Sequence, residues 1–307
     1  MPIINNRRIF FIIIGALTLL AIAAIVFIRP QLSIEFTGGS IVEVVYDAER
    51  PELETVRARV DVLGYDHPSI RESGEKGITL RSRTLTPEEH VLLLGALSNN
   101  GEQALTELRF NSIGPSLGNE LAIKALYAIA GVILAIVFYI AWAFRQVSRP
   151  VTSWVYGFIV VAILIHDIIV PTGFYAIWSY FTGAQIDSLF VVALLAILGY
   201  SVNDTIVIFD RVREHLRKNE DEEIEEPFEE VVGAAIYDTL GRSINTSVTV
   251  ILALVALAVF GSEVTLNFSL VLLSGVVVGT YSSVLLAAPL LIPMARIFAK
   301  KKEEEVQ

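Results

Sequence analysis

The sequence predicts an integral membrane protein, an all-α bundle of six transmembrane helices with a small α+β domain between the first helix and the second. Hydrophobic residues make up 54% of the 307 residues, and the mean hydropathy is +0.61. Charged residues are only 18%, below the share of about 25% that is usual in soluble domains. Six apolar runs also reach the length of about 20 residues that a helix needs to cross a bilayer.

The six apolar runs lie at residues 9–28, 125–144, 154–178, 188–209, 244–261 and 268–295. The first run follows Arg7 and Arg8, so a cleaved signal peptide is an alternative interpretation of it. Its apolar core is about twice as long as that of a signal peptide. We therefore interpret residues 1–30 as a short N-terminus and a retained first transmembrane helix.

The short connections between the runs differ in charge. Lys and Arg gather near both termini and in the connections after the second and fourth runs, whereas the loops at 179–187 and 262–267 contain neither. Because Lys and Arg favour the cytoplasmic side, we expect both termini in the cytoplasm. The segment 31–122 is then extracytoplasmic, since long segments cross the membrane regardless of their charge.

The segment 31–122 alternates strand and helix signals in the order β-α-β-α-β. Strand-like stretches lie at 33–47, 77–85 and 104–110, and helix-like stretches at 51–64 and 86–100, the latter with Thr86 as cap and Pro87 in the first turn. This order predicts a ferredoxin-like α+β domain. Its histidines, His67 and His90, are isolated in the sequence, and we interpret them as surface residues.

Residues 123–295 hold the second to sixth transmembrane helices, and 296–307 form a charged cytoplasmic tail. Between the fourth and fifth runs, the stretch 227–241 places its apolar residues on one helical face. An amphipathic helix on the cytoplasmic side, lying along the membrane surface or docking a partner, is expected there.

Ionisable residues within the runs are few. The third run contains His166 and Asp167, and the fourth contains Asp204 preceded by Asn203. Arg242 stands just before the fifth run, where Asn245 and Thr246 follow on the same stripe. An aspartate at the centre of a membrane helix costs about 3 kcal/mol on insertion scales, so these faces are expected to point into a bundle, a partner or a wet cavity.

Two interpretations of Asp204 and Arg242 are open. They form either a buried pair that only fixes the helix register, or a proton-relay site in which Asp204 loads and releases a proton under the control of Arg242. We favour the relay for Asp204 and structural hydrogen bonding for His166 and Asp167.

Other classes of function fit less well. The net charge of −10 disfavours nucleic-acid binding, and the chain has no Cys and no GxxxxGK[ST] nucleotide motif. We expect no cofactor, no metal site and no enzymatic activity. An intramembrane aspartyl protease with Asp167 and Asp204 as its dyad is the remaining enzymatic alternative, although its Gly-x-Gly-Asp signature is absent.

Five segments together carry a family resemblance: IEFTGGS at 34–40, IGPSLGNEL at 113–121, LGYSVNDTIVIFDRVRE at 198–214, LGRSINTS at 240–247 and GVVVGTYSSVLLAAPL at 275–290. The chain resembles the SecF-type members of the SecD/SecF family, in the resistance-nodulation-division superfamily. The resemblance implies six membrane helices, a bacterial cell-membrane location and use of the proton-motive force in protein export. By motif, Asp204 corresponds to the family's proton-relay aspartate and Arg242 to its essential arginine.

The resemblance also implies partners. A SecD chain supplies the second six-helix half, and the SecYEG translocon, YajC and a translocating polypeptide are the expected neighbours. A proton-driven small-molecule exporter half of the same superfamily is the alternative. Such exporters carry two halves and two large outer domains in one chain, whereas this chain has one half and one small domain.

Overall fold

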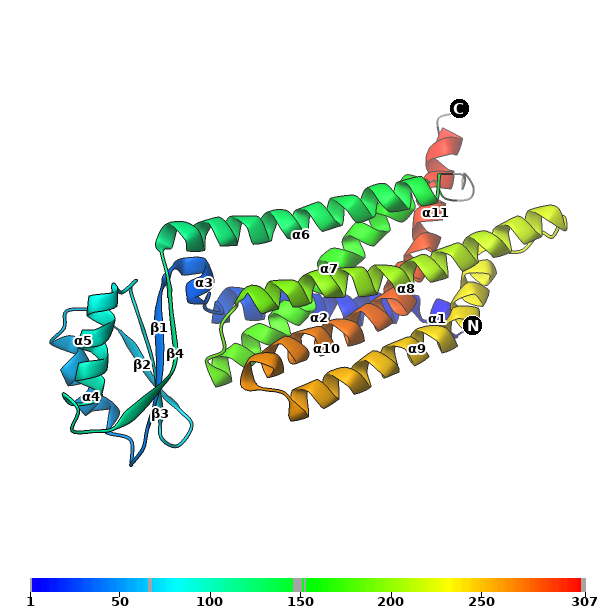
Figure 1. Cartoon of the computed structure of the whole chain (residues 1–307). Helices are drawn as coiled ribbons and strands as arrows, with labels where there is room; N and C mark the ends of the chain where they lie inside the picture. The colour runs from blue at the N-terminus through cyan, green and yellow to red at the C-terminus, as the bar shows by residue number, and fades with distance from the viewer. Residues whose placement is uncertain (1, 66–67, 146–150, 152, 305–307) are drawn as a thin grey trace. The chain divides into compact units, whose positions relative to one another are not determined.

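A computed structural model gives the structure of the chain and describes every residue except 1, 66–67, 146–150, 152 and 305–307 (Figure 1). The expected surface residue His67 and the end of the expected tail lie outside the described residues. The chain divides into two compact units, one of Met1–Gln31 with Tyr127–Gln307 and one of Leu32–Leu126.

Within the described residues, six helices are long and apolar enough to cross a membrane. This confirms the prediction of a mostly helical protein with six membrane-helix candidates. The candidates are Arg7–Ile28, Pro115–Ala143, Trp154–Thr182, Ser188–Asp221, Phe228–Phe260 and Thr265–Ile297. The helices that form them are α2 (Arg7–Ile28), α6 (Pro115–Ala143), α7 (Ser153–Thr182), α8 (Ser188–Asp221), α9 (Phe228–Phe260), and α10 (Glu263–Ser282) with η1 (Ser283–Ala287) and α11 (Ala288–Glu304).

Helix α8 is central in this unit and packs against α7, α9 and α10 (Figure 1). Its contact with α10 is close because of two glycines on α10. A Cβ atom added to Gly275 would lie 2.1 Å from the Ile197 side chain, and one added to Gly279 would lie 2.9 Å from the Cβ atom of Ser201. The GVVVG segment of the sequence therefore packs against α8, as small-xxx-small motifs commonly do.

The last membrane helix is not regular. It consists of α10, a π-helical stretch η1 and then α11. A π-helical stretch inside an α-helix is uncommon and is often found at functional sites. This stretch begins at Ser283, whose hydroxyl contacts α8 through the Thr205 hydroxyl at 2.8 Å.

The stretch 228–241 differs from its expected position. It is the first part of α9 and is continuous with the fifth membrane helix. Its apolar residues Val231, Val232, Ala235 and Ile236 are buried in the core of the helical unit. The chain itself therefore covers the face that was expected to meet a membrane surface or a partner. Helix α8 likewise continues to Asp221, beyond the predicted end at 209.

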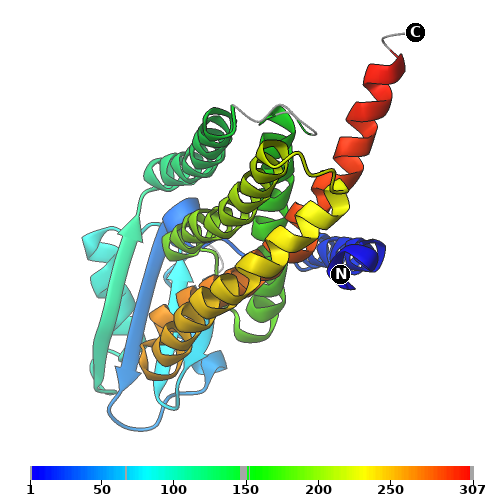
Figure 2. The ribbon, with the colours of Figure 1, turned by 90° about the vertical axis from the view of Figure 1, so that its right-hand side faces the viewer.

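The smaller unit contains a four-stranded antiparallel sheet and two helices in the order β1-α4-β2-β3-α5-β4. The sheet order is β2-β3-β1-β4, and β1 lies beside β4 (Figure 2). The helices pack on one face of the sheet, where alternate strand residues are buried with them. The elements are β1 (Gly39–Tyr46), α4 (Leu53–Asp61), β2 (Ser69–Ser73), β3 (Gly77–Ser82), α5 (Pro87–Leu97) and β4 (Leu105–Ile113).

Two details of this unit depart from the predicted β-α-β-α-β order. Residues Ile34–Thr37 form a short helix, α3, because the Ser33 hydroxyl accepts a hydrogen bond from the Glu35 amide and the chain turns through positive φ at Gly38. Strand β2 is a fourth strand that the sequence did not predict. It is five residues long, and Ile70 is its only buried residue, so it has no alternating hydrophobic pattern.

Candidate functional site

The polar side chains of the membrane helices form two clusters around α8, one centred on Asp167 and the other on Asp204. The first surrounds Asp167 of α7, which is fully buried. One carboxylate oxygen lies 2.7 Å from His166 Nδ1, and the other accepts hydrogen bonds from the hydroxyls of Ser201 and Ser282, the latter at 3.0 Å. Tyr281 OH lies 3.3 Å from His166 Nε2. This first cluster ties α7, α8 and α10 together, and both carboxylate oxygens of Asp167 have partners.

The second cluster surrounds Asp204 of α8, which is 5% exposed. Its Oδ2 atom is buried and has no hydrogen-bond partner among the described residues, and the same is true of Ser243 Oγ. Ser243 and Arg242 of α9 are the polar side chains close enough to influence the carboxyl group of Asp204. Among the described residues Arg242, which is exposed, forms no ion pair with Asp204.

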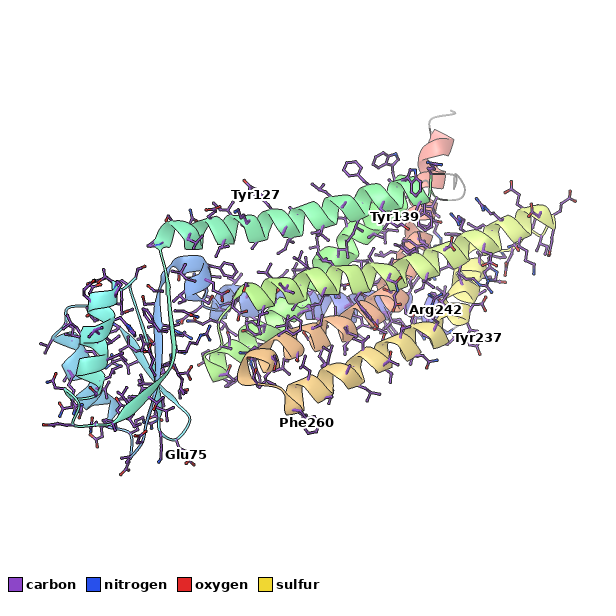
Figure 3. The ribbon with its side chains drawn as sticks, viewed as in Figure 1. Glu75, Tyr127, Tyr139, Tyr237, Arg242 and Phe260 are labelled. Atoms are coloured by element: carbon purple, nitrogen blue, oxygen red, sulfur yellow. The ribbon has the colours of Figure 1, made fainter. Side chains whose placement is uncertain are left out.

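The other predicted residues of this cluster lie on its open side, which is the side exposed on the surface of the single chain. Asn203 on α8 and Arg242, Asn245 and Thr246 on α9 are all exposed, and Figure 3 shows Arg242 on α9. The Thr246 hydroxyl bonds back to carbonyls of its own helix, at Arg242 and Ser243. Polar groups on membrane helices are costly when they face lipid. The exposed row of Asn203, Arg242, Asn245 and Thr246 therefore indicates that a partner covers it.

Hydroxyl groups link the helices around the second cluster. The Tyr200 hydroxyl of α8 donates to Ser247 Oγ of α9 at 2.9 Å, and Ser247 Oγ lies 2.6 Å from the Thr280 hydroxyl of α10. Thr205, adjacent to Asp204, bonds to Ser283 at the start of η1. Asp204 is therefore the immediate neighbour of a residue that joins α8 to the π-helical stretch η1. A change in the charge or hydrogen bonding of Asp204 would occur next to this contact.

The structure thus separates the predicted site residues into two groups. Asp204 faces Arg242 and Ser243, whereas His166 and Asp167 belong to the other cluster. Sequence reasoning missed the hydroxyl residues Ser201, Thr205, Ser243, Ser247, Thr280, Tyr281, Ser282 and Ser283. The run TYSS at 280–283, four hydroxyl residues within an apolar segment, was the available signal.

Across the described residues, no group of three or more His, Cys, Asp or Glu side chains is arranged to hold a metal ion. His90 of the smaller unit stacks on Phe110 at 3.8 Å between ring centroids, and its Nε2 lies 2.9 Å from Glu107. Its side chain is only 15% exposed, so the histidine that was expected on the surface is largely buried against Phe110.

Comparison with known proteins gives a consistent result. The family model described as protein export membrane protein SecD/SecF, C-terminal, matches residues 94–296. The chain is 37% identical to protein translocase subunit SecF of Thermobaculum terrenum, covering 89% of each chain, and 34% identical to that of Anaerolinea thermophila, covering 94% of this chain and 92% of the relative. It is also 32% identical to protein translocase subunit SecDF of Bacillus subtilis, over 92% of this chain and 37% of that longer protein.

Among solved structures, the chain is similar to the crystal structure of SecDF, a translocon-associated membrane protein from Thermus thermophilus. The TM-score is 0.79 at 27% sequence identity, and the match covers 95% of this chain and 38% of that one. The chain therefore spans well under half of the SecDF polypeptide. On the family model and the identities to its relatives, the chain belongs to the SecD/SecF family of protein-export membrane proteins.

Proposed function

We propose that this chain is a SecF-type subunit that works with SecD to assist protein export through the Sec translocon, using the proton-motive force. The names of the relatives support an export role, and the observation that carries the proton coupling is Asp204. Its carboxyl group is buried in a membrane helix with one oxygen that no described residue satisfies.

A buried and unsatisfied carboxylate is unfavourable in a low-dielectric environment, whereas the protonated form avoids the cost of burying a charge. The nearby Arg242 stabilises the ionised form when it approaches. Asp204 can therefore exist in two charge states whose balance depends on the position of α9. A proton crossing a potential of 100 mV supplies about 2.3 kcal/mol, which is enough to shift such a balance.

The roles of the remaining predicted residues follow from their places. Asn203, Asn245 and Thr246 form the open side of the second cluster, where we propose that they meet polar groups of SecD. His166 and Asp167 act through the hydrogen bonds that hold α7, α8 and α10 together.

The smaller unit, by this proposal, is a ferredoxin-like extracytoplasmic domain. Its βαββαβ element order and its sheet order β2-β3-β1-β4 support the ferredoxin-like assignment. Both termini then lie in the cytoplasm of a bacterial cell, with SecYEG, YajC and the translocating polypeptide as proposed neighbours.

The two alternatives have less support. In an aspartyl protease the two carboxyl groups share a proton and lie side by side, but the partners of Asp167 are His166, Ser201 and Ser282 rather than Asp204. A small-molecule exporter half of the same superfamily would use the same buried carboxyl, so the nature of the cargo has to be tested directly.

The decisive experiment measures translocation of a precursor protein into membrane vesicles with ATP held constant and the proton gradient varied. Asp204→Asn keeps the size of the side chain but cannot ionise. We expect it to remove the part of translocation that depends on the gradient, while the amount of protein in the membrane stays normal. Asp210→Asn is the matched control, because Asp210 lies on the same helix but is exposed and paired with Arg213.

If Asp204→Asn translocates at the wild-type rate under a full gradient, the proton-site proposal is wrong. A parallel loss of membrane abundance and activity by the same factor would instead assign Asp204 a structural role. Loss of gradient-driven drug efflux with unchanged precursor translocation would favour the exporter alternative.

A further inference from the structure

The sheet of the smaller unit has one face that its helices leave uncovered. Val42, Val44, Ile78 and Leu80 point toward α4 and α5 and are fully buried. Because strand residues alternate between faces, their neighbours point the other way. These are Ser69, Arg71 and Ser73 of β2, Thr79 and Arg81 of β3, Ile41, Glu43 and Val45 of β1, and Arg109 and Asn111 of β4.

Three arginines from three strands gather on this face. Arg71 lies opposite Thr79, Thr79 opposite Glu43, and Glu43 opposite Arg109, so these residues form one row across the sheet. Arg81 stands in the adjacent row, opposite Ser69 on one side and Ile41 on the other. Acidic residues outnumber basic ones between 32 and 126, so this face differs in charge from the rest of its domain.

The surroundings of the Arg81 guanidinium are unfavourable for its positive charge. Its Nε atom is buried and has no hydrogen-bond partner among the described residues. Burial first, and then the charges of Arg71 and Arg109, lower the pKa of the Arg81 guanidinium from its ordinary value. The ion pairs of this domain include Arg50–Glu72, Arg83–Glu89, His90–Glu107 and Lys124–Glu120. Among the described residues, none joins a carboxylate to Arg81 or Arg109. Glu43, the acidic residue of the row, accepts a hydrogen bond from Ser73 at 2.8 Å.

From this arrangement we propose that the uncovered face binds an acidic stretch of extended polypeptide through carboxylates that reach Arg71, Arg81 and Arg109. The arginines come from three of the four strands, which favours a ligand with several carboxylates over a single small anion. Strands lie about 4.8 Å apart, so the main chains of Arg71 and Arg109 are separated by about 14 Å across the sheet. An extended chain covers about 13 Å in four residues, with alternate side chains on the same side, so successive acidic side chains can each meet a different arginine.

The inference rests on the proposed export function only for the source of the polypeptide, which would be the chain that emerges from the translocon. Binding itself needs neither SecD nor a gradient. It can therefore be measured on the purified full chain in neutral detergent, and it stands or falls separately from the Asp204 experiment.

The probe is a fluorescein-labelled peptide of alternating Glu and Ser, compared by fluorescence anisotropy with the same peptide carrying Gln for Glu. We expect the Glu peptide to bind and the Gln peptide to bind at least about tenfold more weakly, since hydrogen bonds between two charged groups are about twice as strong as those between neutral groups. Arg81→Gln and Arg109→Gln should each weaken binding about fivefold, and added salt should weaken it further.

Arg57→Gln is the matched control, because Arg57 is exposed on α4, on the other side of the sheet, and loses the same charge. It should change binding by less than about twofold, as expected for an exposed residue outside the contact. Arg81→Lys keeps the charge but not the planar fork of the guanidinium, so it tests whether the weaker peptide binding of Arg81→Gln comes from the lost charge. Thermal unfolding of each variant tests whether that variant still folds.

Equal binding of the Glu and Gln peptides would overturn the proposal. So would a loss in Arg57→Gln equal to that in Arg109→Gln, which would indicate attraction by overall charge. Binding to phosphatidylglycerol vesicles that is lost in Arg81→Gln and Arg109→Gln, without peptide binding, would assign the face to a membrane surface instead.

Discussion

Single residues determine how closely α10 approaches α8. At Gly279 an added Cβ would lie 2.9 Å from the Cβ and 3.2 Å from the Cα of Ser201, so the backbone of α8 would have to move. Because Ser201 donates to the Asp167 carboxylate, Gly279→Ala should disturb the first cluster as well. We expect it to lower the free energy of unfolding by about 1–3 kcal/mol, as overpacking usually does, measured by denaturation in detergent.

Gly199→Ala on α8 is the control, since its added Cβ meets nothing within 4 Å and alanine favours a helix. Equal losses in both variants would mean that close packing at 279 is not the cause.

The residues of the candidate site were predictable to different extents. Asp167, Asp204 and His166 were found because ionisable side chains are conspicuous in apolar runs. Serine and threonine were missed because many of them in a helix simply bond to a carbonyl of the previous turn, as Thr18 does to Ile14. No single-sequence signal separates such a residue from Ser201, which reaches across to another helix. The different partners of Asp204 and Asp167 also depend on which helices are neighbours, and a sequence does not contain this directly.

The α5 helix shows how a local motif sets the stability of one element. Thr86 and Glu89 form a capping box, in which the Thr86 hydroxyl accepts from the Glu89 amide and Glu89 accepts from the Thr86 amide. The Arg83 guanidinium, followed by the Thr86 amide, lowers the pKa of Glu89 from 4.5 to about 2. Since this pKa is lowered on folding, the ionised group stabilises the domain above about pH 4.5, and the effect is lost as the pH falls toward 2.

A variant tests this directly. Glu89→Gln should lower the melting temperature of the domain at pH 7, and the difference from wild type should shrink steadily as the pH falls below about 4.5. The measurement is thermal unfolding of the full chain followed at several pH values. Glu54→Gln in the first turn of α4 is the control, because Glu54 is exposed. A difference that stays constant down to pH 3 would contradict the assigned role of the Glu89 charge.

Elements were predicted well where they are long. Apolar runs of about 20 residues identify membrane helices by composition alone, but their ends were misjudged where charged residues continue the helix, as in 210–221 of α8. Strand β2 was missed because an edge strand with one buried residue has no periodic pattern. The junction of 228–241 with the fifth membrane helix was missed for a different reason: burial of its apolar face depends on helices far away in the sequence.

At the scale of the whole molecule, the expected orientation can be tested because the chain contains no cysteine. Single cysteines at Glu75, in the turn between β2 and β3 (Figure 3), and at Thr182, at the end of α7, should react with a membrane-impermeant maleimide in intact cells. A cysteine at Glu220, near the end of α8, should react only after permeabilisation. All three positions are exposed, so a difference between them reports on the side of the membrane. Labelling of position 220 in intact cells would reverse the orientation.

The exposed polar row on α8 and α9 makes the most demanding prediction about the whole molecule. Asn203, Arg242, Asn245 and Thr246 are exposed in the single chain. The Thr246 hydroxyl bonds to carbonyls of its own helix, but lipid offers no hydrogen-bond partner to the side chains of the other three. We therefore expect the chain to be degraded when it is expressed alone and to accumulate when a SecD-like chain is co-expressed.

A cysteine at Asn245 should crosslink to that chain. A cysteine at Phe260, which is 87% exposed at the other end of α9, is the control for random collision, and it should crosslink much less. The measurements are membrane abundance by immunoblot and crosslink yield with and without the partner. A chain that accumulates alone, unfolds cooperatively in detergent and gives equal crosslinking from both positions would show that the row does not need SecD, and that these polar groups are satisfied in another way.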